Sequence, residues 1–202
     1  MVLSKIDDLK KNEFEKALTQ RRVSCIKKLS GIRSQEVSYY RFLNNAKVKE
    51  QDLIDSICRE TANKISGGHV LALQDTSEFN FQWNKNRKKE STGLGPCRAS
   101  GSLGFLLHPT LALNAETLEV YGFSHIQMWH REKESGTKHD RKYQNLPVKS
   151  KESYKWIEGS LKSGEALQNA DKVTIVEDRE GDIYSQFCEV PQKNIHLLIR
   201  NS

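Results

Sequence analysis

The chain contains two short apolar runs that each end on an aspartate, Val70-Leu71-Ala72-Leu73-Gln74-Asp75 and Val173-Thr174-Ile175-Val176-Glu177-Asp178. Runs this rich in Val, Ile and Leu are typical of strands buried in the middle of a sheet. If the two strands are parallel neighbours, both carboxylates emerge at the same edge of the sheet. There they can share a divalent metal ion, which is the basis of metal-assisted phosphodiester chemistry. The two runs therefore decide both the predicted fold and the predicted site.

The pattern after residue 68 predicts a mixed α/β sheet. Strands are expected over 70–75, 78–83 (half-buried), 104–114, 118–123, 173–178 and 195–199, with one helix capped by Ser150 and a short helix stopped by Pro191. A strand–helix–strand unit requires a parallel crossover connection. This order is similar to the ribonuclease H-like fold, in which the first and fourth strands are parallel neighbours, so the two aspartates are expected to converge.

The first 67 residues predict a small helical domain. Apolar residues recur at helical spacing, Ser34 is a candidate cap for a short helix, and Asn44-Asn45 is a candidate stop. Gly67-Gly68 marks the change from helical to strand periodicity. We therefore expect two domains, residues 1–67 and residues 68–202.

Composition limits the class of partner and the compartment. The chain has 202 residues, a net charge of +6 and 36% hydrophobic residues, which favours a polyanionic partner such as nucleic acid. Its four cysteines show no Cys-x-x-Cys spacing, so reduced thiols are expected rather than disulfides or a zinc site. Without an apolar leader or a membrane-length apolar stretch, the prediction is a cytoplasmic protein that does not bind membranes.

Several motifs together resemble one enzyme family. They are 72–81 (ALQDTSEFNF), 93–96 (GLGP), 107–110 (LHPT), 176–184 (VEDREGDIY) and, in the helical part, 39–45 (YYRFLNN). Their combination over most of the chain resembles the cut-and-paste DDE transposases of bacterial insertion sequences, of the IS-four type. The resemblance implies that Asp75 and Asp178 are the first two acids of a catalytic Asp-Asp-Glu triad that binds Mg²⁺ or Mn²⁺.

The resemblance also implies the partners of this chain. It implies that the helical domain binds double-stranded DNA at transposon ends, and that the intact family forms homodimers. The expected DNA contacts are Arg21, Arg22, Lys27, Lys28, Arg33, Tyr40, Arg41, Lys85, Arg87, Arg98 and Arg200. Arg179 and Lys193 are further candidates for positions near the scissile phosphate.

The third acid of the family is missing from this sequence. In the family it lies in a helix with the pattern Tyr, two residues, Arg, three residues, Glu, six residues, Lys, and none of the six tyrosines here has an Arg three positions later. The expectation is an N-terminal fragment with a ribonuclease H-like core that is incomplete at its C-terminus. DNA binding with little strand transfer is the activity expected of it.

The acidic residues and histidines also fit plainer structural roles. Either aspartate can simply end a strand, and Asp178 or Asp182 can cap the next helix, a role that suits Asp182 better. Glu78, Glu180 and Asp182 are extra acids that fit solvated or capping positions, and the spacing of His125, His130 and His139 fits no zinc pattern. Two rival functions also remain: a non-catalytic DNA-binding protein that competes for transposon ends, and a standalone metal-dependent nuclease.

Overall fold

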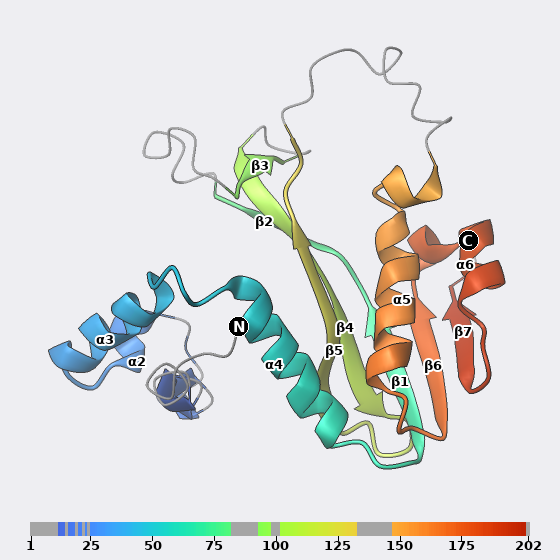
Figure 1. Cartoon of the computed structure of the whole chain (residues 1–202), viewed down its shortest axis with the longest axis horizontal. Helices are drawn as coiled ribbons and strands as arrows, with labels where there is room; N and C mark the ends of the chain where they lie inside the picture. Colours follow the sequence, from blue (N-terminus) through green and yellow to red (C-terminus); the bar gives the residue numbers. More distant parts are fainter. Residues whose placement is uncertain are drawn as a thin grey trace. The chain divides into compact units, whose positions relative to one another are not determined.

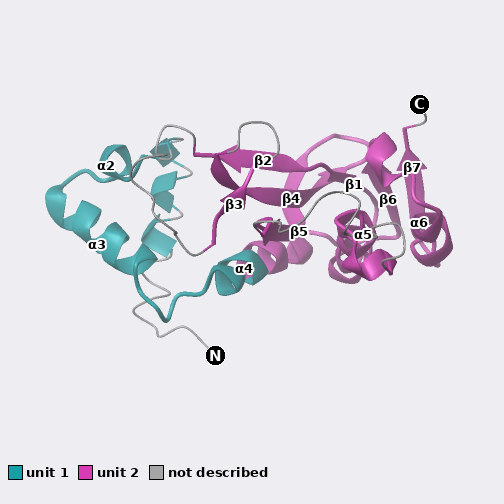
Figure 2. Ribbon diagram, turned by 90° about the horizontal axis from the view of Figure 1, so that it is seen from above, with its two compact units in different colours: residues 1–55 teal, residues 56–202 magenta. Residues whose placement is uncertain are grey.

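The computed structural model describes residues 12–14, 16–18, 20, 21, 23, 25–81, 93–97, 102–132 and 147–200. Its internal contacts divide the chain into two compact units, residues 1–55 and 56–202 (Figure 2). The division falls within helix α4, Glu50–Asn63, whereas the predicted boundary at Gly67-Gly68 lies between α4 and the first strand.

The N-terminal unit contains helices α2, Ile26–Leu29, and α3, Arg33–Leu43. Tyr39 and Phe42 are the buried residues of α3, and the ring of Phe14 lies 5.0 Å from that of Tyr39, between centroids. The expected cap at Ser34 is wrong, because α3 begins at Arg33 and Ile32 occupies the N-cap position. The expected stop is confirmed, since Asn44 is the C-cap of α3.

The second unit is built on a seven-stranded mixed sheet (Figure 1). Its strands are β1 His69–Gln74, β2 Ser77–Asn80, β3 Gly95–Pro96, β4 Leu103–Asn114, β5 Val120–Trp129, β6 Lys172–Glu177 and β7 Ile195–Ile199. β4 pairs antiparallel with β1 on one side and with β5 on the other. β1, β6 and β7 are parallel neighbours in that order. The predicted α/β class, a mixed sheet preceded by helices, is confirmed.

Two predicted strands differ from their expectations. The fourth, expected over 118–123, is β5 and extends to Trp129, and the second is shorter and more exposed than predicted. β2 covers only Ser77–Asn80, and all four of its residues are exposed instead of half-buried. Among the described strands β2 pairs only with β4, so it lies at the margin of the sheet. Alternating aromatic residues therefore predicted a strand correctly but overestimated how much of it is buried.

Two helices make the crossover connections between parallel strands. α5, Tyr154–Ala166, connects β5 to β6, and α6, Tyr184–Glu189, connects β6 to β7. The expected cap at Ser150 is wrong, because Ser150 ends a short 3₁₀ turn and Ser153 is the N-cap residue of α5. α6 ends before Pro191, as predicted.

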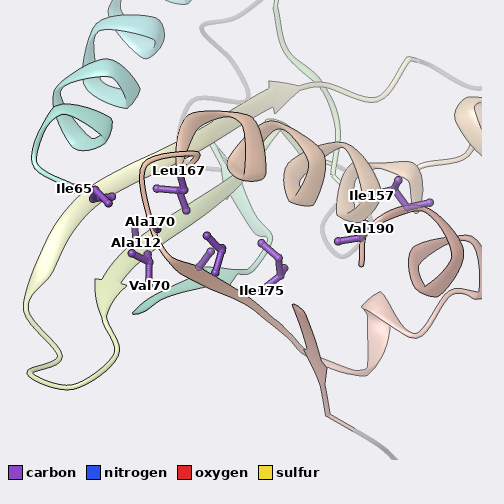
Figure 3. Close-up of a cluster of buried hydrophobic side chains, with 10 residues drawn as sticks. Ile65, Val70, Ala112, Ile157, Leu167, Ala170, Ile175 and Val190 are labelled. Carbon is purple, nitrogen blue, oxygen red and sulfur yellow. The ribbon is translucent and has the colours of Figure 1, made fainter. Parts of the chain in front are cut away.

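The core lies between α5 and one face of the sheet. Strand residues alternate along β1 and β6, so that Val70, Ala72, Val173 and Ile175 all face inward. These residues pack with others in one cluster, which contains Ile65, Val70, Ala72, Ala112, Ile157, Leu167, Ala170, Val173, Ile175 and Val190 (Figure 3). The cluster fixes β1 and β6 as the central strands of the unit.

Two further findings concern the environment of the chain. None of the described helices combines the length and the apolar character needed to cross a membrane. All four cysteines lie in the described part of the chain, and none of them forms a disulfide. The sequence-based prediction of reduced thiols is consistent with this finding.

The core assignment predicts a difference in stability between two strand substitutions. Ile175→Ala should lower the free energy of unfolding by about 2–5 kcal/mol, because it opens a cavity beneath α5. Leu198→Ala in β7 should cost less than about 1 kcal/mol, because this side chain is 59% exposed. Urea denaturation followed by circular dichroism measures both values. Equal losses in the two variants would show that Ile175 is not at the centre of the core.

Candidate functional site

The two aspartates lie at the same edge of the sheet. β1 and β6 pair in parallel with a register that continues to Leu73 opposite Val176. Asp75 follows Leu73 by two residues, and Asp178 follows Val176 by two residues. The two aspartates therefore come directly after Gln74 and Glu177. The parallel pairing that the sequence predicted thus places the two exposed aspartates at the carboxyl ends of neighbouring strands, the edge at which open α/β sheets usually bind ligands.

Each carboxylate is oriented by a local backbone hydrogen bond. Asp75 Oδ1 accepts from the backbone N–H of Thr76 at 2.7 Å. Asp178 Oδ1 accepts from the backbone N–H of Glu180 at 2.8 Å and so caps the 3₁₀ helix η4, Arg179–Gly181. The expected capping of the next helix by Asp178 or Asp182 is wrong, because α6 begins at Tyr184 and Ile183 is its N-cap residue, without a side-chain cap. Capping engages Oδ1 of Asp178 and leaves its second carboxylate oxygen, Oδ2, outside this hydrogen bond.

This donor set fits a hard divalent cation. Mg²⁺ in proteins is commonly bound by one or two carboxylates together with water and substrate phosphate oxygens. Asp75 and Asp178 are both exposed, and the backbone hydrogen bonds of both engage Oδ1, which makes Oδ2 the natural ligand atom. Within the described ranges no group of three or more His, Cys, Asp or Glu side chains is arranged to hold a metal ion. The described residues therefore offer two carboxylate ligands.

Basic residues near this edge are placed by the parallel strand β7. Arg200 follows β7 directly, and its backbone N–H donates to the carbonyl oxygen of Glu177 at 3.1 Å. Arg200 therefore lies beside Asp178 at the same edge. Lys193 precedes β7, whose first residue pairs with Val173 at the start of β6. The expectation for Lys193 is wrong, because that position belongs to the opposite edge of the sheet.

A buried polar network lies directly beneath the two aspartates. Gln74 and Glu177 are the last inward-facing residues of β1 and β6, and both are buried. His108 of β4, fully buried, lies 2.8 Å from Gln74 Oε1 through Nε2 and 2.9 Å from Thr76 Oγ1 through Nδ1. This arrangement connects Thr76, the residue after Asp75, to the interior. The network therefore fixes the end of β1.

Ser160 of α5 is the centre of that network. Its Oγ accepts from the amide nitrogens of Gln74, at 2.7 Å, and Gln186, at 2.8 Å. The hydroxyl also lies 2.9 Å from Glu177 Oε1 and 2.8 Å from the carbonyl oxygen of Trp156, which are the acceptors for its single proton. One serine thus joins α5, α6, β1 and β6 under the site.

Burial changes the ionisation of two members of the network. Desolvation raises the pKa of Glu177 to about 7, although hydrogen bonds from Ser160 and Gln186 act in the opposite direction. Desolvation, aided by the positive charge of Lys155, lowers the pKa of His108 to about 3. His108 is therefore neutral at physiological pH, and a large part of Glu177 is protonated.

Close packing around the network requires glycine at two positions. A Cβ at Gly181 would overlap Glu177 Oε2, and one at Gly159 would lie 2.6 Å from Gln74 Oε1. Since real Cβ atoms do not approach this closely, any larger residue would displace the buried carboxyl or amide. Gly181 follows Asp178 by three residues, so its small size lets the η4 turn close over Glu177.

The extra acids and histidines are accounted for in other ways. Glu78 pairs with Arg131, which also binds Glu152 at 2.8 Å. Glu180 and Asp182 are exposed residues of the η4 turn. His125 lies within β5 and His130 directly after it, while His139 lies outside the described residues. None of these residues joins the two aspartates in a recognisable ligand set within the part of the chain described.

The predicted DNA contacts divide between the two units. In the N-terminal unit the exposed residues are Arg21, Lys27, Lys28, Arg33, Tyr40 and Arg41. Tyr40 is 47% exposed, whereas its neighbour Tyr39 is buried against Phe14. The side chain of Arg33 pairs with Glu36 at 2.8 Å. Arg22, Lys85, Arg87 and Arg98 lie outside the described residues, so their contacts stay predictions.

Sequence reasoning missed the buried network, although a signal was present. Gln74 and Glu177 occupy the third inward position of two strands whose other inward residues are apolar. Two polar residues at matching positions of paired strands indicate a shared partner, because buried polar groups are nearly always hydrogen-bonded. The partners Ser160 and Gln186 come from helices and carry no such signal in the sequence.

No protein-family model matches this chain. The strongest elements of the site geometry are the parallel pair β1–β6 and the two aspartates at its carboxyl edge.

The buried histidine predicts a pH dependence of stability. The pKa of His108 is lowered from 6.5 to about 3, so the unfolded chain binds a proton that the folded chain does not bind between these values. This contribution destabilises the fold as the pH falls, by up to about 1.4 kcal/mol per pH unit. The raised pKa of Glu177 has the opposite effect: its contribution to the free energy of unfolding is lost as the pH rises from 4.5 to about 7.

A variant separates the histidine contribution from that of Glu177. The free energy of unfolding of the wild type, relative to that of His108→Gln, should increase with pH between about 4 and 6.5. Denaturation curves at several pH values measure this difference, and His130→Gln, which changes an exposed histidine, is the control and should give a nearly flat difference. A flat difference for His108→Gln as well would mean that His108 is not held neutral in the fold.

Proposed function

We propose that this chain carries the DNA-binding helices and much of the catalytic core of a metal-dependent DNA strand transferase of the DDE transposase type. Support comes from the strand order β5-β4-β1-β6-β7, with β1, β6 and β7 parallel and β4 antiparallel to β1. Helical crossovers connect β5 to β6 and β6 to β7. This order and these directions agree with a ribonuclease H-like core.

One observation carries the proposal. The parallel register of β1 and β6 brings two exposed aspartates from distant parts of the sequence to equivalent positions at one edge of the sheet. Asp75 and Asp178 would hold the divalent ion, which when bound supplies Lewis-acid activation of a water or hydroxyl and of the phosphate. The protein's own contribution is to fix both carboxylates on rigid strand ends, through the Thr76 and Glu180 amides and the buried network below.

The proposed substrate is double-stranded DNA. Exposed basic residues of α2 and α3, with the exposed ring of Tyr40, supply groups for phosphate and base contacts. In the second unit Arg200 is next to Asp178 and can contact a strand at the metal edge. Because the described residues supply two acidic ligands, we expect DNA binding by this chain with little strand transfer of its own.

A specific observation favours one rival, a non-catalytic DNA-binding protein. Both aspartates have local structural roles, since each accepts a hydrogen bond from a backbone amide within two residues. On this alternative the carboxylates only end their strands, and DNA binding depends on the basic helices alone. It predicts that DNA affinity is independent of metal ions and survives Asp75→Ala and Asp178→Ala.

Metal binding separates the two functions. Titration with Mn²⁺, followed by the loss of its free electron paramagnetic resonance signal, should show binding to the wild type. Asp75→Asn and Asp178→Asn should each weaken it by about tenfold or more, because each removes a ligand. Glu116→Gln removes an exposed acid in the β4–β5 turn and should leave Mn²⁺ affinity unchanged.

Two results would count against the proposal as stated. Mn²⁺ affinity that is equal in the wild type and both aspartate variants would favour the non-catalytic rival. Robust Mg²⁺-dependent nicking of a supercoiled plasmid, abolished by Asp75→Asn, would contradict the expectation of little activity in this chain. Circular dichroism of each variant confirms that the fold is retained.

A further inference from the structure

A lysine on α5 lies at the same sheet edge as the two aspartates. β5 is antiparallel to β4, as β1 is, so β5 ends at the edge where β1 and β6 end. α5 starts at this edge and runs back beneath the sheet, since Ala170, just beyond its end, packs in the core with Val70. Lys155 is the second residue of α5. Its backbone therefore lies in the layer directly behind the metal edge.

The side chain of Lys155 is nearly buried, close to two tryptophan rings. The residue is only 8% exposed, and its Nζ lies 5.4 Å from the ring centroid of Trp156 and 5.8 Å from that of Trp129. Aromatic faces attract an ammonium group and pack against the methylene stem. Trp156 is itself fully buried and makes an edge contact with His108 at 4.7 Å between centroids. The two tryptophans therefore fix the position of the charge.

An acidic partner of Lys155 comes from the turn that orients Asp178. Lys155 Nζ lies 3.8 Å from Glu180 Oε2, a long distance for an ion pair. The side chain of Glu180 is 64% exposed, so it can move into solvent without cost to the core. The ammonium is thus fixed by its surroundings, while the carboxylate that pairs with it is exchangeable.

Contacts link Lys155 to both aspartates. On one side Glu180 donates its backbone N–H to Asp178. On the other side Trp156 contacts His108, which in turn bonds Thr76, the residue after Asp75. The positive charge of Lys155 also contributes to lowering the pKa of His108, which agrees with its proximity to this edge. A rigid cation therefore belongs to the same cluster as the two carboxylates.

We propose that Lys155 binds a phosphate oxygen of a nucleic-acid strand at the Asp75–Asp178 edge, and that Glu180 forms an ion pair with the ammonium when no nucleic acid is bound. This inference rests on the proposed function, because it takes the polyanion at this edge to be DNA. A fixed ammonium beside two carboxylates offsets part of their repulsion for the phosphate backbone. Lys155 is thus a positioning residue for the strand, and Glu180 is a competitor of the phosphate.

The test uses the full chain and a fluorescein-labelled random-sequence DNA duplex in Mn²⁺, with affinity measured by fluorescence anisotropy at several salt concentrations. Lys155→Met keeps an apolar stem between the tryptophans and removes the charge. It should weaken binding by about threefold or more. The slope of log affinity against log salt concentration should also fall by about the value of one phosphate contact. Lys155→Arg should restore most of the affinity, because it restores the charge.

Two further variants make the result specific. Glu180→Gln should strengthen DNA binding, because it removes the competing carboxylate, and this gain should be largely lost in the Lys155→Met background. Lys162→Met removes an exposed charge from the same helix, where Lys162 pairs with Glu165 at 3.0 Å, and should change the affinity little. If Lys155 had a merely structural role, Glu180→Gln would strengthen DNA binding equally in the wild-type and Lys155→Met backgrounds, because removing a negative charge reduces repulsion of the DNA in both.

The outcomes distinguish this inference from the proposed function. If the wild type binds Mn²⁺ through Asp75 and Asp178 but Lys155→Met binds DNA as the wild type does, only the role of Lys155 is overturned. If Glu180→Gln binds DNA no more tightly than the wild type, the competition is overturned. If the aspartate variants retain Mn²⁺ binding, the proposed function itself fails. Should Lys155→Met fold poorly, the Lys155→Arg and Glu180→Gln results still decide the question.

Discussion

The parallel pairing of β1 with β6 is the constraint on which the rest of the second unit depends. It joins two segments about a hundred residues apart, and such a connection needs a crossover helix, which α5 provides. Ile157 of this helix packs with residues of both strands in the core cluster. Because the strands run in the same direction, the residues after them meet at one edge. Loss of this pairing would separate Asp75 from Asp178.

The second constraint is the buried polar network, which lies between the apolar core and the carboxyl edge of the sheet. Gln74, Glu177, Ser160 and Gln186 bring side chains from two strands and two helices into one buried set of hydrogen bonds. Breaking one member of such a set leaves its partners unsatisfied, which costs about 1–3 kcal/mol for each group. The network therefore holds the strand ends in one arrangement, and it also separates the exposed carboxylates from the apolar interior. Rigid carboxylates directly above a buried polar layer suit a site that must present fixed ligands.

Much of this fold was predictable because its signals are local. The apolar runs of β1, β6 and β7, the long strand β4 and the helix ended by Pro191 follow from periodicity and from proline chemistry. Helix starts were less predictable, since Ser34 and Ser150 look like caps but the helices begin elsewhere. The burial of β2 was also overestimated, because alternation of Phe79 with polar residues does not reveal that the strand lies at the margin of the sheet. The buried network was missed because half of its members lie on helices, far along the chain from the strands.

Residue type and short-range spacing are enough to predict the two strands that end on aspartates, the basic character of the helices, and the sheet class. The positions of Arg200 beside Asp178 and of Lys193 at the opposite edge depend instead on strand register, which is known from the folded chain. The folded chain also shows that Lys155, one of many basic residues in the sequence, is fixed between two tryptophans. Contacts of this kind arise when distant segments pack together, and no local pattern encodes them.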